Sequence, residues 1–202
     1  MSILRLTTLG VGAMRSPRYA PAGLLVEHAG TRVMIDGGPG AAPTGRLDAW
    51  LVTDERAELA PGIRRLARAL GVEPAAESFA KHGLSIERHD VAHTSHPAYG
   101  YRIRAGDATV VWAPEFWEFP DWADDADLLF AEASSWKRRI HFAGKVGGHM
   151  DAVSVCREAQ RRGIGRLVLA HIGRPTIRAR DAGEAPPFGE FGDDGRVYRI
   201  RV

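Results

Sequence analysis

The chain has 202 residues, of which 45% are hydrophobic and 26% are charged, as is typical of a globular protein with one substantial core. The net charge of +2 favours neither nucleic acid nor a membrane surface, and a single cysteine excludes an intramolecular disulfide or a cysteine metal cluster. Because the sequence shows no secretory signal and no run of about 20 apolar residues, we expect a single cytoplasmic domain over residues 1–202 without membrane contact.

The first half of the chain predicts mostly strands joined by tight turns. Two short apolar runs flank Ala29-Gly30-Thr31, which indicates a hairpin. A later run places Ile63, Leu66 and Leu70 on one face and ends at Gly71, which indicates a helix. The predicted strands are 3–9, 23–28, 32–36 and 47–53, and the predicted helix is 60–70.

The second half alternates strands with helical patterns. Asp151 precedes an amphipathic segment and is a suitable N-cap residue. Antiparallel hairpins followed by alternating strands and helices predict an α/β fold with two sheets packed face to face and helices outside. The predicted strands are 84–92, 99–103, 108–113, 127–130, 167–171 and 196–202, and the predicted helix is 151–162.

Polar side chains follow five of the predicted strands. Strand ends at one rim of a two-sheet sandwich can converge, and converging carboxylates and imidazoles are the ligand set of a divalent metal. Each residue taken alone is more often a turn residue or a histidine without catalytic function. The five residues are Asp36, Asp54, His93, Glu115 and His171.

Seven segments occur in an order that matches a known family. They are TTLGVGA, LLVEHAGTRVMIDGGPG, LDAWLVTDERAELAPGIRRL, HTSHPAYGYRI, VVWAPE, GGHMDA and LVLAHIGRP. Together they resemble the metallo-β-lactamase fold hydrolases, and within them the RNase Z-like and phosphodiesterase-like branch. The resemblance extends over nearly the whole chain and implies a four-layer αβ/βα sandwich of two mixed sheets.

The sequence departs from this family in the signature HxHxDH motif. Aligned on Thr53, the four ligand positions of that motif are Asp54, Arg56, Glu58 and Leu59. A guanidinium is always protonated and an alkyl side chain has no lone pair, so two of the four positions cannot bind a metal. The usual two-zinc site therefore cannot be assembled.

The resemblance leaves two interpretations of the metal site. In the first, Glu58, Glu115 and His171 hold one Zn, Mn or Fe ion, with His93 as a further ligand nearby. In the second, Arg56 fills the vacated metal position and neutralises the surrounding carboxylates, so that no metal is bound.

Further residues are candidates for catalysis and substrate binding. The resemblance implies that His149 contacts or protonates a leaving group, although a loop histidine that helps to cap a helix is an equal alternative. Asp54 is a second catalytic candidate. Arg56 and Trp117 are candidate substrate-binding residues, and Trp117 belongs to an aromatic cluster that is more often core packing.

Two functions follow as hypotheses. The first is a hydrolase of a phosphodiester or small ester with an altered mononuclear metal site, acting on a small-molecule or nucleotide-like substrate. The second is a metal-free, non-catalytic binding protein. A basic segment at Lys137–Arg139 would allow nucleic-acid contact, but a solvated loop is favoured there. The family resemblance also allows a homodimer.

Overall fold

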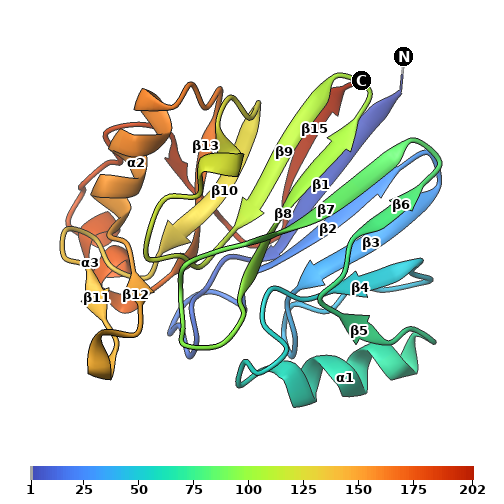
Figure 1. Cartoon of the computed structure of the whole chain (residues 1–202), viewed down its shortest axis with the longest axis horizontal. Helices are drawn as coiled ribbons and strands as arrows, with labels where there is room; N and C mark the ends of the chain where they lie inside the picture. The colour runs from blue at the N-terminus through green and yellow to red at the C-terminus, as the bar shows by residue number, and fades with distance from the viewer. Residues whose placement is uncertain (1) are drawn as a thin grey trace.

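Two mixed β-sheets pack face to face in the computed structural model, which describes residues 2–202 apart from the side chain of Lys145 (Figure 1). The first sheet has the strand order β15-β1-β2-β3-β4-β5. Its strands are β1 (Ile3–Gly10), β2 (Gly23–His28), β3 (Thr31–Asp36), β4 (Ala49–Leu51), β5 (Pro74–Ala75) and β15 (Arg196–Arg201). Only the β3–β4 and β4–β5 pairs are parallel.

The second sheet has the strand order β14-β13-β10-β9-β8-β7-β6. Its strands are β6 (Phe79–Lys81), β7 (Leu84–Asp90), β8 (Tyr99–Ala105), β9 (Ala108–Ala113), β10 (Leu128–Ala133), β13 (Leu167–Ile172) and β14 (Glu190–Phe191). Strands β9, β10, β13 and β14 are parallel to one another, whereas β6, β7 and β8 form an antiparallel meander. A separate hairpin joins β11 (Ile140–His141) to β12 (Gly148–His149).

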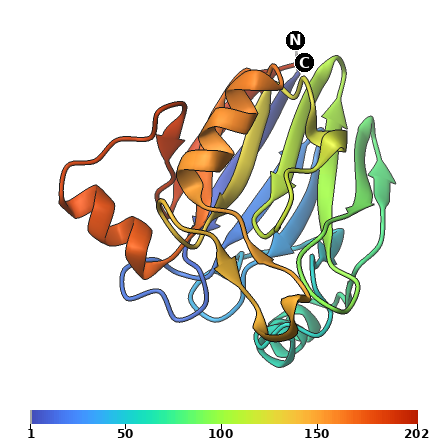
Figure 2. The ribbon, with the colours of Figure 1, turned by 60° about the vertical axis from the view of Figure 1, so that its left-hand side comes forward.

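Helices cover the outer faces of both sheets and complete four layers (Figure 2). On the first sheet, Ile63 and Ala67 of α1 (Ala60–Ala69) pack in one cluster with Met34 and Trp50. On the second sheet, α2 (Ala152–Arg161) and α3 (Arg174–Asp181) belong to another apolar cluster. Two short 3₁₀ turns are Asp121–Ala123 and Ala143–Lys145. The α/β sandwich of two mixed sheets expected from the sequence is confirmed.

The main core lies between the two sheets. Large side chains from both sheets, including Tyr101, Trp112, Phe130 and Tyr198, are almost fully buried there. Removing this much apolar surface from water is the dominant stabilising term in a fold of this kind. No helix in the described residues is long and apolar enough to cross a bilayer.

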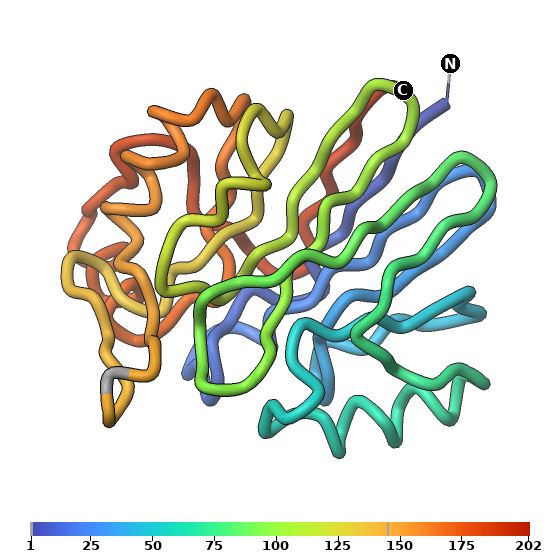
Figure 3. The backbone as a smooth tube through the Cα atoms, in the orientation of Figure 1, coloured from blue at the N-terminus to red at the C-terminus, as the bar shows by residue number. Residues whose placement is uncertain are grey.

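Strand direction explains why distant residues meet. The parallel pair β3–β4 ends at one rim of the sandwich, and the parallel strands β9, β10 and β13 end at the same rim, where the backbone trace brings their following loops together (Figure 3). Strand β7 has the same direction as β9, because each is antiparallel to β8. The predicted convergence of strand ends at one rim is therefore found in the structure.

Candidate functional site

A chain of alternating imidazoles and carboxylates lies at this rim. The carboxylate of Glu115 contacts His171 Nε2 at 2.6 Å through Oε1 and His93 Nε2 at 3.3 Å through Oε2. On the other side of its ring, His171 Nδ1 is 3.5 Å from Glu132 Oε1, and Glu132 Oε2 is 2.6 Å from His149 Nδ1. We call these five residues the histidine–glutamate network.

Protein groups hold the far sides of two of these rings. His93 Nδ1 lies 2.9 Å from the Gly148 carbonyl oxygen, and His171 Nδ1 lies 2.8 Å from Ser134 Oγ. A carbonyl accepts only, so the Nδ1 of His93 carries the proton and its Nε2 faces Glu115. Such outer hydrogen bonds fix ring orientation in metal-binding and catalytic histidines.

Glu132 anchors the network from inside the protein. Its side chain is fully buried, and it accepts hydrogen bonds from the backbone N–H groups of Ser134 (2.7 Å) and Phe116 (3.3 Å) in addition to the contact with His149. A buried carboxylate is tolerated only with such a set of donors. The residue is therefore a fixed negative charge that orients His149.

The backbone is distorted where the network residues leave their strands. The register between β10 and β13 shifts between Ala131 and Ala133, which is a β-bulge beside Glu132 and His171. His171 also has a φ of 54°, and Asp36 has a φ of 55°, in the left-handed region that non-glycine residues rarely adopt. Unusual backbone conformations of this kind concentrate at functional sites.

The close pairing shifts the titration of the network. Burial would lower the pKa of His171, but the carboxylate of Glu115 outweighs it and raises that pKa to about 10. Burial would raise the pKa of both glutamates, yet the adjacent imidazolium of His171 holds the Glu115 value well below its usual range and His149 lowers the Glu132 value to about 2. In the metal-free protein the Glu115–His171 contact is therefore an ion pair at neutral pH.

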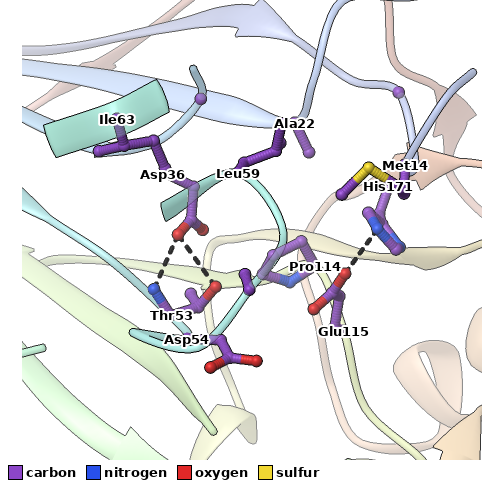
Figure 4. A pocket seen from close by; sticks show the side chains of 13 residues that line it. Met14, Ala22, Asp36, Thr53, Asp54, Leu59, Ile63, Pro114, Glu115 and His171 are labelled. Atoms are coloured by element: carbon purple, nitrogen blue, oxygen red, sulfur yellow. Dashed lines mark hydrogen bonds and ion pairs between the residues drawn. The ribbon is translucent and has the colours of Figure 1, made fainter. Parts of the chain in front are cut away.

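Asp36 and Asp54 share a pocket with Glu115 and His171 that is partly open to solvent (Figure 4). Asp36 accepts hydrogen bonds from the Thr53 backbone and hydroxyl and from Trp112 Nε1. Burial raises the pKa of Asp36 to about 6, against the opposing effect of these donors. The pocket thus holds three carboxyl groups beside one imidazole.

Asp54 is paired within the protein. Its Oδ2 lies 2.9 Å from His96 Nε2, and its Oδ1 accepts a hydrogen bond from the backbone N–H of Arg56. The second contact is a local turn in which an aspartate bonds the backbone two residues on. His96, although only three residues from His93, therefore pairs with Asp54 instead of joining the network.

Three predicted site residues lie apart from this cluster. Glu58 is exposed and 3.7 Å from the Arg15 guanidinium. Arg56 is exposed, and its guanidinium makes no ion pair within the described residues, so it does not fill a metal position. Trp117 packs against His141 and Arg139 rather than lining the pocket. The turn at Asp54 directs residues 56 and 58 to solvent, which a motif alignment does not reveal.

Two residues of the site were not predicted from the sequence. The predicted strand 127–130 stops before Glu132 and Ser134. In the structure β10 continues to Ala133, so Glu132 lies within the strand and Ser134 follows it directly. A glutamate between two alanines at the end of an apolar run is the one available signal, because charged residues are almost never fully buried unless paired.

Comparison with known proteins places this geometry in a known fold. No protein-family model and no curated protein matches the sequence. Among solved structures, YhfI from Bacillus subtilis, a metallo-β-lactamase fold protein, matches with a TM-score of 0.76 and 19% identity over 99% of this chain and 100% of that chain. The chain has the metallo-β-lactamase fold. A diphosphatase of the PhnP family shares this fold (TM-score 0.75, 19% identity, 99% and 98% coverage), as does human tRNase Z, short form (0.69, 15%, 98% and 100%).

The donor atoms at the rim are of the types that bind a divalent ion. Glu115 offers a carboxylate, and His93 and His171 direct Nε2 atoms at it with their Nδ1 atoms already engaged, which suits one divalent ion. Arg56 and Leu59, at two of the four aligned motif positions, supply no ligand for a further ion.

A second group of ligand atoms lies behind the first. Glu132, His149 and His171 offer three atoms within 4.8 Å of one another. An ion at either group would require its ligand atoms to move apart, because both Glu132 Oε2–His149 Nδ1 and Glu115 Oε1–His171 Nε2 are 2.6 Å, shorter than the roughly 3.3 Å between neighbouring ligand atoms around a tetrahedral zinc ion. The carboxylate of Glu132 is also fully buried and bonded to two backbone N–H groups. In the described geometry this group is a hydrogen-bonded support of the first.

Proposed function

We propose that the protein is a hydrolase that cleaves a small ester or phosphodiester with one divalent ion, Zn, Mn or Fe. Glu115, His93 and His171 would hold the ion, and Glu58 is no longer part of the proposed ligand set. The observation that carries this proposal is the meeting of two oriented Nε2 atoms on the single carboxylate of Glu115 beside an open pocket. The diphosphatase and tRNase Z that share the fold support a hydrolytic function.

The residues of the site would each have a separate role in the reaction. A bound divalent ion would supply Lewis-acid chemistry, polarising the substrate and making water a better nucleophile. His149, oriented through Nδ1 by the buried Glu132, would give a proton to the leaving group from its other nitrogen. Asp54, held by His96 and lining the pocket, would position the substrate or the attacking water.

A second candidate function is that of a metal-free binding protein. The direct 2.6 Å contact between Glu115 and His171 favours it, because this ion pair satisfies both groups without an ion. In that case a carboxylate, and not Arg56, occupies the centre of the site. Either function would use a small-molecule ligand. The cytoplasmic location and the homodimer remain predictions from the sequence.

Metal analysis separates the two functions. The protein would be purified without chelators, its transition-metal content measured, and Zn and Mn titrated by calorimetry, with turnover of bis(4-nitrophenyl) phosphate and 4-nitrophenyl acetate as the activity test. The hydrolase proposal expects one ion per chain and turnover that Glu115→Gln abolishes, while the exposed Glu58→Gln control retains both. Absence of metal, of metal binding and of turnover in the wild type would reject it.

A further inference from the structure

The pocket beside the histidine–glutamate network has an apolar wall. Figure 4 shows Leu59 and Ile63 on one side of it and Pro114 and Met14 nearer His171. Ile63 follows Leu59 by four residues, so the two side chains share one face at the start of α1. The apolar side chains that line the pocket are Met14, Ala22, Ala57, Leu59, Ile63 and Pro114.

The wall stands where the resemblance places a metal ligand. Leu59 is aligned with the last histidine of the family motif, and its side chain lines the pocket instead of binding an ion. Loss of one metal position has thus left an apolar recess beside the remaining one.

The charges around this recess are predominantly negative. Three carboxyl groups, those of Asp36, Asp54 and Glu115, line the pocket with His171, and no arginine or lysine of the described residues lines it. The guanidinium of Arg15 is 82% exposed and paired with Glu58. One divalent ion carries fewer positive charges than these three carboxylates carry negative ones, so an anionic phosphodiester would enter against net repulsion.

We infer that the substrate is a neutral ester whose small apolar acyl group lies against Leu59 and Ile63, and not a phosphodiester. This inference rests on the proposed hydrolase function and narrows its substrate class. In the reaction the oxygen of water bonds to the acyl carbon and the ester C–O bond breaks. The products are a carboxylic acid and an alcohol: the alcohol oxygen takes a proton from His149, the attacking water returns one to His149, and no oxidant or reductant is required.

Binding of uncharged analogues tests the pocket without relying on turnover. The zinc-loaded protein would be titrated by NMR with N-phenylacetamide, N-phenylbutanamide and diphenyl phosphate. Each methylene moved from water to an apolar wall contributes about fourfold in affinity, so the butanamide, with two more methylenes, should bind about sixteenfold more tightly than the acetamide. Diphenyl phosphate should bind at least about tenfold more weakly than the butanamide.

Variants assign the preference to the wall and to the charge. Leu59→Ser should remove most of the chain-length preference, while Leu66→Ser, which changes a half-buried leucine of α1 outside the pocket lining, should preserve it. Ala57→Lys adds the missing cation and should raise the affinity for diphenyl phosphate. Circular dichroism would show that each variant is folded, and Ile63→Thr gives a second test of the wall.

The outcomes distinguish this inference from the function on which it rests. Tight butanamide binding that Leu59→Ser weakens, together with hydrolysis of 4-nitrophenyl butyrate, supports both. The same binding pattern without any hydrolysis supports the pocket assignment and rejects the hydrolase. Equal or tighter binding of diphenyl phosphate, or a chain-length preference that survives both Leu59→Ser and Ile63→Thr, overturns the inference.

Discussion

At the scale of single residues, Glu115 is the centre of the site because its carboxylate contacts the Nε2 atoms of two histidines and also lines the pocket. Its side chain is three-quarters buried, so loss of its charge would not be compensated by water. We expect Glu115→Gln to reduce zinc affinity at least about tenfold, since an amide is a poorer ligand than a carboxylate. Calorimetric titration measures this, and wild-type affinity in the variant would exclude Glu115 as a ligand.

The raised pKa of His171 makes the stability of the metal-free protein depend on pH. The value is about 10 in the folded protein and about 6.5 in the unfolded chain, so the stabilisation is complete below pH 6.5 and lost as the pH rises towards 10. The free energy of unfolding should fall over this interval by at most about 1.4 kcal/mol per pH unit relative to His171→Gln.

Urea denaturation of chelated protein at several pH values provides the measurement for His171. The lowered pKa of Glu115 acts in the opposite direction and removes stability only as the pH falls below about 4.5. The pair is therefore most stabilising between about pH 4.5 and 6.5. If the free energies of unfolding of the wild type and His171→Gln change in parallel with pH, the ion pair does not contribute to stability.

Glu132 should matter more for stability than any exposed carboxylate. Its removal leaves two buried backbone N–H groups and His149 without their acceptor, so Glu132→Ala should cost about 3 kcal/mol or more. Glu58→Gln is the matched control, because its exposed pair with Arg15 should contribute no more than about 0.5 kcal/mol. Similar denaturation midpoints for both variants would contradict the anchoring role of Glu132.

At the scale of secondary-structure elements, the β11–β12 hairpin positions two of the histidines. The backbone of Gly148 donates to the His93 carbonyl and accepts from the His93 ring, while its neighbour His149 joins the network. Gly148 has a φ of 153°, and a Cβ there would lie 1.8 Å from the Ile140 carbonyl oxygen. Any larger residue must therefore displace one hairpin strand from the other.

Gly148→Ala should accordingly disturb the site. We expect zinc affinity to fall about tenfold or more, as when an outer-shell partner of a metal ligand is removed. Gly30→Ala is the control, because its Cβ meets no atom within 4 Å and only the left-handed backbone is strained. Equal zinc affinities in the two variants, measured by calorimetry, would show that the hairpin does not orient His93.

The elements themselves were predictable to very different degrees. Strands β2 and β9 match their predicted ranges because turn residues bound short apolar runs on both sides. Helix α3 was missed because its arginine-rich sequence buries only Thr176, Ile177 and Ala179 and so lacks a wide apolar stripe. Strands β5, β11, β12 and β14, of two residues each, are too short to show any periodicity.

The positions of the site residues were predictable only where the direction of the preceding strand determines them. Residues after parallel strands meet at one rim whatever their side chains, which brought His93, Glu115 and His171 together. Glu58 does not follow a strand, and its direction depends on the hydrogen bond from the Arg56 backbone to Asp54. A local turn of this kind decides which side chain faces the pocket, and neither spacing nor motif alignment encodes it.

At the scale of the whole molecule, the site lies at the rim of the inter-sheet core, which it meets through the hydrogen bond from Trp112 to Asp36. The inter-sheet core buries its apolar side chains without any contribution from an ion, whereas the network is at the rim where the strands end. A structural metal, by contrast, makes folding depend on its binding. The chelated protein should therefore keep its secondary structure and unfold in one cooperative transition.

Zinc should then act on this fold only as a bound ligand. At a free zinc concentration about 100 times the dissociation constant, binding adds about 2.7 kcal/mol to the free energy of unfolding. This corresponds to a Tm increase of about 5–10 °C for a chain of this size. Differential scanning calorimetry with and without zinc measures the increase, and at the same zinc concentration a tenfold loss of affinity in Glu115→Gln should reduce it to about half. Unfolding on chelation would make the ion structural, whereas an unchanged Tm in the wild type would favour the metal-free binding protein, because an ion that binds the native state must stabilise it.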